Sequence, residues 1–246
     1  MPAAKLDLVL PCFNPINNWE NNILTSVARI RELMPETELF IYLVNDGSTK
    51  PIPSEKITFL AQNLPDFRYL QYSVNRGKGH ALRYGVAETQ NEFCIYTDID
   101  FPYTEESLVA VFKTLAEEKQ DIAVGVRDEN YYANVPATRV RISKTLRFFT
   151  KKMLLLPVSD TQAGLKGFNR RGREVFLKTG IDRYLFDLEF LFAAAKIPNL
   201  RIKPVKITLK PGIVFSKMNS KILVNEGYSF IKLFVSSPFT KLKQTR

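Results

Sequence analysis

The chain has 246 residues, of which 45% are hydrophobic, and it carries a formal net charge of +10. A chain of this length can bury one sizeable core. No apolar run in it approaches the roughly 18 to 20 residues that a helix needs to cross a bilayer, so we expect no membrane-spanning segment. The positive charge indicates a polyanionic partner, for which nucleic acid, anionic lipid and a phosphorylated substrate are all candidates.

The N-terminus runs directly into a strand-like segment without a charged leader, an apolar stretch and a cleavage site, which predicts a cytoplasmic protein. Only two cysteines occur, Cys12 and Cys94, and both lie inside apolar runs. We therefore expect them to be buried as small hydrophobic side chains, without a disulfide framework or a metal cluster.

Short apolar runs alternate with segments of helical periodicity through the first half of the chain. The expected strands are 6–10, 39–44, 67–72, 93–97 and 122–126, and the expected helices are 19–34, 54–62, 79–89 and one that begins after Thr104 as N-cap. This alternation predicts an α/β fold with a mainly parallel central sheet flanked by helices. Ligands of such sheets bind at the carboxyl ends of the strands.

The alternation weakens after residue 126. A long helical candidate covers 136–156, a segment at 160–168 follows, and another helix is expected near 185–195. We expect this half to line the acceptor side of a site. Cationic and apolar residues separate onto opposite arcs of 141–153, which fits either a helix on an anionic bilayer or a surface helix packed on the sheet. The lysine-containing stretch after residue 215 carries the same ambiguity.

Two carboxylates, Asp98 and Asp100, directly follow the fourth expected strand, where both can reach one cation. Hard oxygen ligands select Mg²⁺ or Mn²⁺, which keep positions open for substrate phosphates. A solvated turn is the alternative interpretation of the same pair.

A glycine-rich loop at 75–79 follows the third expected strand and opens a helix. Its glycines let backbone N–H groups approach an anion, and Lys78 adds a point charge, although a simple turn is the alternative. The loop lacks the spacing of a dinucleotide-binding or Walker-type motif, which disfavours a dehydrogenase or a kinase. His80 is the only histidine, so no multi-histidine zinc site can form, and we expect His80 near phosphates without a proton-carrying role.

These segments together resemble the family 2 inverting glycosyltransferases of GT-A fold, and within them the dolichyl-phosphate mannose and glucose synthases and their bacterial polyprenyl-phosphate relatives. The resemblance covers residues 6–208. It rests on Leu10-Pro11-Cys12-Phe13-Asn14 with Glu20 downstream, Val44-Asn45-Asp46-Gly47-Ser48, Asn75-Arg76-Gly77-Lys78-Gly79, Asp98-Ile99-Asp100, Val124-Gly125-Val126-Arg127, Asp160-Thr161-Gln162-Ala163-Gly164-Leu165-Lys166 and Phe186-Asp187-Leu188-Glu189.

The resemblance implies a role for each matched position. Asp46 would contact the nucleotide base, Lys78 and its loop the diphosphate, and Asp98 with Asp100 the metal. The implied donor-binding residues are Pro11, Phe13, Asn14, Glu20, Asp46, Gly47, Asn75, Gly77, Lys78 and Ile99. The implied catalytic residues are Asp98, Asp100, Asp160, Gln162 and Arg127, and the implied acceptor-binding residues are Arg127, Arg139 and Ser143.

The expected activity is transfer of a hexose from a UDP- or GDP-linked sugar to a polyprenyl or dolichyl phosphate, with Mg²⁺ or Mn²⁺. A phosphate acceptor needs little deprotonation, whereas a hydroxyl acceptor would need a carboxylate base, for which Asp160 and Asp187 are candidates. Transfer to a glycan hydroxyl in cell-surface polysaccharide synthesis is the alternative. We expect a catalytic domain at 1–210 and a basic appendage at 211–246, peripheral on the inner face of a membrane.

A nucleic-acid-binding protein would also account for the positive charge. It would not account for Asp98 and Asp100, whose charges repel phosphates unless a metal intervenes, and the chain has no zinc-ligand or RNP-type motif. We therefore expect no nucleic-acid partner.

Overall fold

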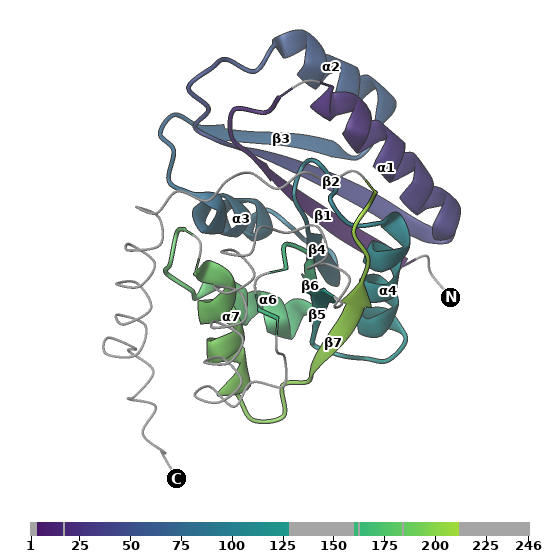
Figure 1. Cartoon of the computed structure of the whole chain (residues 1–246), viewed down its shortest axis with the longest axis vertical. Helices are drawn as coiled ribbons and strands as arrows, with labels where there is room; N and C mark the ends of the chain where they lie inside the picture. Colours follow the sequence, from purple (N-terminus) through teal and green to yellow (C-terminus); the bar gives the residue numbers. More distant parts are fainter. Residues whose placement is uncertain (1–3, 17, 128–159, 162, 184, 212–246) are drawn as a thin grey trace.

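The structure is a computed structural model that describes residues 4–16, 18–127, 160–161, 163–183 and 185–211 (Figure 1). The expected helix at 136–156, with Arg139 and Ser143, lies outside the described residues, as do Gln162 and nearly all of the expected appendage at 211–246. In the part that is described, no helix is long and apolar enough to cross a membrane.

Strands and helices alternate through most of the described chain. Their order is β1 (Ala4–Cys12), α1 (Trp19–Leu33), β2 (Thr37–Asp46), α2 (Ser54–Asn63), β3 (Phe67–Tyr72), α3 (Lys78–Ala87), β4 (Phe93–Tyr96), α4 (Glu105–Ala116), β5 (Ile122–Arg127), β6 (Lys166–Phe168), α6 (Arg170–Leu177), α7 (Phe186–Ala195) and β7 (Ile202–Ile207). Each helix and strand expected between residues 6 and 126 is present, and β1 continues one residue beyond Pro11.

Seven strands among the described residues form one sheet in the order β3-β2-β1-β4-β6-β5-β7. Neighbours pair in parallel, except that β6 runs antiparallel to both β4 and β5. The mainly parallel α/β sheet expected from the sequence is therefore confirmed. The antiparallel β6 places the start of the 160–168 segment beside the carboxyl ends of β4 and β5.

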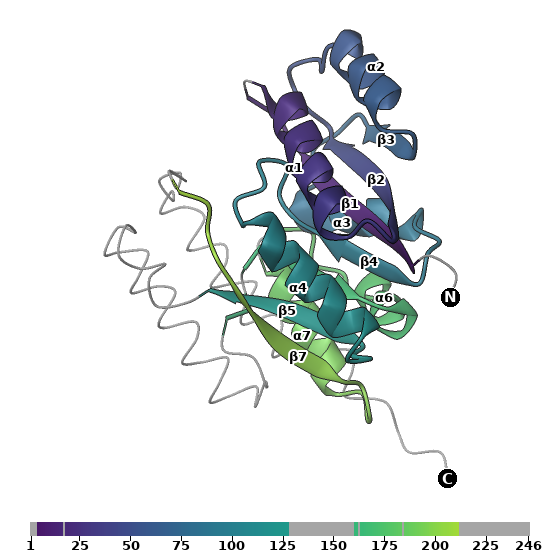
Figure 2. The same ribbon diagram turned by 90° about the vertical axis from the view of Figure 1, so that its right-hand side faces the viewer.

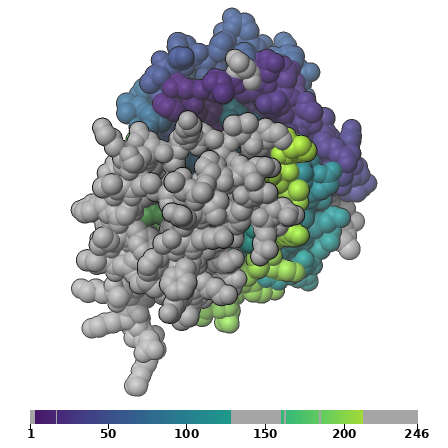
Figure 3. Space-filling model, viewed as in Figure 1, coloured from purple at the N-terminus to yellow at the C-terminus, as the bar shows by residue number. Residues whose placement is uncertain are grey.

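Side-chain alternation along the strands divides the core between the two faces of the sheet. Leu8 and Leu10 of β1 pack with α1, α2 and α4, whereas Val9 packs on the opposite face with α3, α6 and α7. Figure 1 shows α1 and α4 to the right of the sheet and α3, α6 and α7 to its left. The turned ribbon and the space-filling view both show β7 running beside α4 (Figures 2 and 3). Both faces of the sheet are thus covered by helices.

Two local predictions are confirmed. Thr104 caps α4, and its side chain accepts a hydrogen bond from the Ser107 N–H at 3.4 Å. Cys12 and Cys94 are both free and buried. Burial raises the pKa of the Cys12 thiol to about 12, so it stays protonated as a small apolar group.

Candidate active site

Lys78, Asp98 and Asp100 meet where α3 begins and β4 ends. The Lys78 ammonium donates to Asp98 Oδ1, and both side chains are about one third exposed, at 33% and 36%. Burial alone lowers the pKa of Lys78, but Asp98, Asp187 and Asp100 together raise it above its ordinary value. Desolvation and then the Asp98 charge raise the pKa of Asp100. The group is therefore a charged lysine beside two carboxylates at the carboxyl edge of the sheet.

Asp46 at the end of β2 holds the loop that leads into α3. Its buried carboxylate accepts hydrogen bonds from Tyr72 Oη at 2.7 Å, Asn75 Nδ2 at 2.8 Å, and the backbone N–H groups of Arg76 at 2.8 Å and Gly77 at 2.9 Å. Both carboxylate oxygens therefore bind the loop of this chain. The base contact implied for Asp46 stays a prediction, and it would have to be made alongside these bonds.

The first turn of α3 also uses its backbone N–H groups within the protein. The N–H groups of Gly79 and His80 donate to the Asp182 carbonyl at 2.8 and 3.3 Å. Gly77 has a φ of 110°, and a Cβ there would lie 2.6 Å from the same oxygen, which explains the glycine. Burial lowers the pKa of His80, which keeps its ring neutral. Because these amides already have acceptors within the protein, the contact of the loop backbone with a diphosphate stays a prediction, as does that of the Lys78 ammonium.

Arg127 at the end of β5 forms a bidentate ion pair with Asp160. Arg127 Nε lies 2.7 Å from Asp160 Oδ2, and Nη2 lies 2.8 Å from Oδ1. The Arg127 N–H donates to the same carboxylate at 3.1 Å, and Asp160 is 1% exposed. Two residues that the sequence assigned to the acceptor side are thus brought together, and one edge of the guanidinium is already bound.

Gly164 connects the Arg127–Asp160 pair to the Lys78–Asp98 pair. A Cβ built on Gly164 would lie 2.6 Å from Asp98 Oδ2 and 3.3 Å from Lys78 Nζ. Only a residue without a side chain allows the backbone to pass this close to the carboxylate. The segment that begins at Asp160 therefore reaches both halves of the candidate site.

Lys166, Asp187 and Tyr96 form a buried polar cluster under that segment. Lys166 is 0% exposed, and its Nζ lies 2.8 Å from Asp187 Oδ1 and donates to the Ala163 carbonyl at 2.6 Å. Tyr96 Oη donates to the same Asp187 oxygen. Burial lowers the pKa of Lys166 and raises that of Tyr96, while Asp187 favours the charged lysine. Lys166 ends one of the segments that carry the family resemblance, but the sequence analysis assigned it no role.

The remaining donor-side residues lie at the ends of β1 and β2. Pro11 is buried, Phe13 is 47% exposed, and the Asn14 N–H donates to Ser48 Oγ at 2.9 Å. Asn14 therefore ties the loop after β1 to the loop after β2. Gly47 has a φ of 58° and packs against the backbone of Val74. Their contacts with a donor stay predictions.

Two further donor-side predictions concern Glu20 and Ile99. Glu20 is 8% exposed and lies 2.7 Å from Lys56 Nζ, so its carboxylate joins α1 to α2. Ile99 is partly buried between the two site carboxylates and packs against the core. The donor contacts implied for both residues stay predictions.

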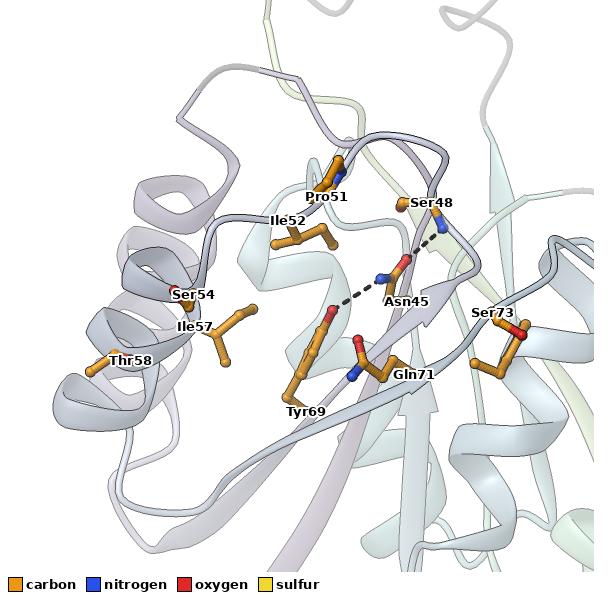
Figure 4. A pocket seen from close by; sticks show the side chains of 11 residues that line it. Asn45, Ser48, Pro51, Ile52, Ser54, Ile57, Thr58, Tyr69, Gln71 and Ser73 are labelled. Carbon is orange, nitrogen blue, oxygen red and sulfur yellow. Dashed lines mark hydrogen bonds between the residues drawn. The ribbon is translucent and has the colours of Figure 1, made fainter.

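A cavity of about 760 Å³ lies between α2 and the edge of the sheet formed by β2 and β3 (Figure 4). Asn45 points into it and donates to Tyr69 Oη at 3.0 Å, and Gln71 and Ser73 lie nearby. The side chains that line it within the described chain include no Lys, Arg, Asp or Glu. A diphosphate and a metal need charged groups, so the carboxylate edge, and not this cavity, is the candidate site for these two.

The residues at the carboxylate edge fit a divalent ion. Asp98 and Asp100 supply hard oxygen ligands at a partly exposed strand end, which suits Mg²⁺ or Mn²⁺ with its other positions left for water and phosphate. The described residues contain no cluster of three or more His, Cys, Asp or Glu side chains that could hold a metal by themselves. Water and a substrate phosphate would fill the positions that Asp98 and Asp100 leave open.

Comparison with known proteins identifies the family. The profile described as Glycosyl transferase family 2 matches residues 7–176, a span that runs from within β1 through β6 and includes the carboxylate edge. The chain belongs to this family. As a family 2 member it confirms the resemblance drawn from its motifs.

Curated relatives of this family 2 chain are named dolichyl-phosphate beta-glucosyltransferase. The protein from Drosophila melanogaster is 27% identical over 210 residues, which cover 80% of this chain and 64% of the relative. The protein from Dictyostelium discoideum is 25% identical over 215 residues, which cover 82% and 65%. The matches thus cover slightly less than two thirds of the length of these relatives.

Solved structures with a similar fold include mannosyl-3-phosphoglycerate synthase from Rubrobacter xylanophilus. Its TM-score is 0.68 at 15% identity, over 99% of this chain and 77% of that one. Glucosyl-3-phosphoglycerate synthase from Mycobacterium tuberculosis, solved with uridine diphosphate, gives a TM-score of 0.65 at 16% identity over 95% and 79%. At these identities the likeness shows the fold, which is the expected GT-A type.

Proposed function

We propose that this family 2 chain transfers a hexose from a nucleotide-diphosphate sugar, UDP- or GDP-linked, to a dolichyl or polyprenyl phosphate. Two things support the proposal: the names of the curated relatives, and the cationic and anionic groups gathered at the carboxyl edge of the sheet. The observation that carries it is the approach of Gly164 to the Lys78–Asp98 pair, because this joins the donor residues to the Arg127–Asp160 pair.

On the donor side, Asp98 and Asp100 would hold Mg²⁺ or Mn²⁺ and Lys78 would bind a diphosphate oxygen. The ion, when bound, neutralises charge on the leaving diphosphate. A related structure carries Mn²⁺, UDP-glucose and phosphoglyceric acid together, which is consistent with metal use in this fold. The Lys78 ammonium donates a charge-assisted hydrogen bond to Asp98. On donor binding it would exchange this bond for one to a diphosphate oxygen.

On the acceptor side, the described carboxylates favour a phosphate over a hydroxyl. A hydroxyl acceptor would need a free carboxylate base, but Asp160 is held by Arg127, and Asp187 is 5% exposed and held by Lys166 and Tyr96. A phosphate oxygen is already anionic and needs no base. Arg127, with Arg139 and Ser143 outside the described residues, would bind that phosphate. Transfer to a glycan hydroxyl is the alternative expected from the sequence, and the choice of acceptor tests it.

Metal-dependent transfer tests the proposal directly. The chain is incubated with UDP-glucose or GDP-mannose, Mn²⁺ and a short-chain polyprenyl phosphate, and the glycosylated lipid is measured. We expect product with one of these donors and none after chelation with EDTA. Equal transfer in excess EDTA, or an Asp100→Ala variant with unchanged rate, would refute the metal role.

A further inference from the structure

Lys166 combines complete burial with hydrogen bonds that lead toward the active site. Its ammonium reaches the Ala163 carbonyl at 2.6 Å and Asp187 Oδ1 at 2.8 Å, and its side chain is 0% exposed. A buried ion pair is weak evidence for stability, since apolar residues of similar volume commonly stabilise a fold as well or better. The contact that an apolar residue could not replace is the bond to Ala163.

Ala163 belongs to the bridging segment, which we define as residues 160–161 and 163–165. At one end of this segment Asp160 binds Arg127, and near the other Gly164 approaches Asp98 and Lys78. Directly after it, β6 pairs with β4 and β5, and Lys166, its first residue, is where the segment joins the sheet. The Ala163 carbonyl is therefore the point at which a core side chain holds the backbone that joins both halves of the site.

Asp187 explains how the lysine can stay charged there. It lies in the first turn of α7, where a carboxylate is favoured, and its Oδ1 accepts from both Lys166 and Tyr96. The opposite charge offsets part of the cost of burying the ammonium. Asp187 thus orients Lys166.

We propose that Lys166, oriented by Asp187, is a positioning residue that fixes the bridging segment between the donor carboxylates and Arg127. This rests on the proposed function, because the geometry to be fixed is that of donor against acceptor. Loss of the bond should misplace the segment while Asp98 and Lys78, carried by β4 and α3, keep their places. A displacement of about 1 Å can lower a rate about a hundredfold.

The test removes both charges together in Lys166→Met with Asp187→Leu, so that no buried charge is left unpaired. The buried Tyr96 hydroxyl loses its acceptor in this variant, so we expect a melting temperature a few degrees below that of the wild type. Amide hydrogen exchange should be faster, by about tenfold, in peptides that cover the bridging segment. Peptides from α3 and β4 should exchange as in the wild type. The kcat for transfer should fall about a hundredfold, with the Kd for UDP and Mn²⁺ within about threefold.

Hydrogen exchange separates the possible failures. Wild-type exchange in the bridging segment of a stable double variant overturns the positioning role, whatever the acceptor is. Absence of transfer by the wild type refutes the proposed function instead. The hydrogen-exchange comparison still tests whether Lys166 fixes the bridging segment. Lys166→Met with Asp187→Asn, which leaves no unpaired charge and keeps an acceptor for Tyr96, is the second variant if the first fails to fold, and wild-type exchange there also overturns the role. Lys203→Met, on the surface of β7, controls for removal of a lysine.

Discussion

Lys78 at the start of α3 and Asp98 after β4 form an ion pair in which the ammonium donates to Oδ1. A divalent ion at Asp98 and Asp100 would compete with Lys78 for the same oxygen. A donor diphosphate would give the released ammonium a new partner. Metal and nucleotide should therefore bind cooperatively, with each increasing the affinity for the other.

The first prediction follows from this competition: loss of the Lys78 ammonium should raise the affinity for Mn²⁺ alone and lower the affinity for the nucleotide. Lys78→Met should bind Mn²⁺ alone more tightly, by up to about fivefold, because a partly exposed ion pair contributes at most about 1 kcal/mol. Its affinity for UDP in the presence of Mn²⁺ should fall about tenfold or more, because a charge-assisted hydrogen bond is lost. Electron paramagnetic resonance of free Mn²⁺ and calorimetry with UDP measure the two effects.

Lys203→Met is the matched control, since Lys203 pairs with Glu118 on the surface of β7. It should leave both affinities unchanged. Weaker Mn²⁺ binding by Lys78→Met would show that the lysine supports the metal site and does not compete with it.

The second prediction concerns the approach of Gly164 to Asp98. In Gly164→Ala the new methyl group would lie 2.6 Å from Asp98 Oδ2, so the carboxylate must move and Mn²⁺ affinity should fall by about tenfold or more. Gly180→Ala is the control, because its Cβ would meet only Glu189 Oε1, at 3.9 Å. Titration of both variants with Mn²⁺ measures the effect. A Gly164→Ala variant that binds Mn²⁺ as tightly as Gly180→Ala would show that Asp98 does not hold the ion.

The third prediction is a pH dependence of stability that comes from Asp121. This residue accepts from the Arg201 N–H at 2.8 Å and from Asn169 Nδ2 at 2.9 Å, which joins β5 to β7 and α6. Burial alone raises its pKa, but these bonds and the nearby arginines hold the pKa below the ordinary value of 3.8. The stabilisation that Asp121 gives the folded state is therefore complete above pH 3.8, the ordinary pKa of the unfolded chain. It is lost as the pH falls through the lower pKa of Asp121 in the folded state.

Asp121→Asn should accordingly be less stable by about 1–3 kcal/mol at neutral pH, since charge-assisted bonds are weakened. The difference from the wild type should shrink below about pH 4, where the wild-type carboxyl becomes protonated. Urea unfolding at a series of pH values measures it. A difference that stays constant down to pH 2 would exclude the proposed linkage.

The first half of the fold could be predicted because its strands are apolar and its helices periodic. The expected strand at 67–72 coincides with β3, and Thr104 supplies the expected cap. The carboxylate pair and Lys78 could be anticipated for the same reason, since the carboxyl ends of parallel strands share one edge.

The strands of the second half were harder to predict, for two reasons: β6 begins with a buried polar residue, and β7 lies at the edge of the sheet. β6 is only Lys166–Phe168, and its first residue is a fully buried lysine. β7 contains two lysines and Pro204, which suit a strand at the edge of the sheet. These residues obscure the apolar pattern by which a strand is predicted from sequence. For α6, Asn169 was an available signal, because its side chain caps the helix by accepting from Gly172. The partners of Lys166 come from α7 and the bridging segment, and their proximity depends on the tertiary fold.

The fourth prediction concerns the acceptor, and it tests the central claim most directly. The chain is given the accepted labelled donor, Mn²⁺ and one of three acceptors: a short-chain polyprenyl phosphate, the corresponding free polyprenol, or a soluble glycan. Because Asp160 and Asp187 are held by cations, we expect transfer to the phosphate and at least a hundredfold less to either hydroxyl, a difference of about 2.7 kcal/mol in transition-state free energy. Transfer to the glycan with none to the phosphate would contradict the account.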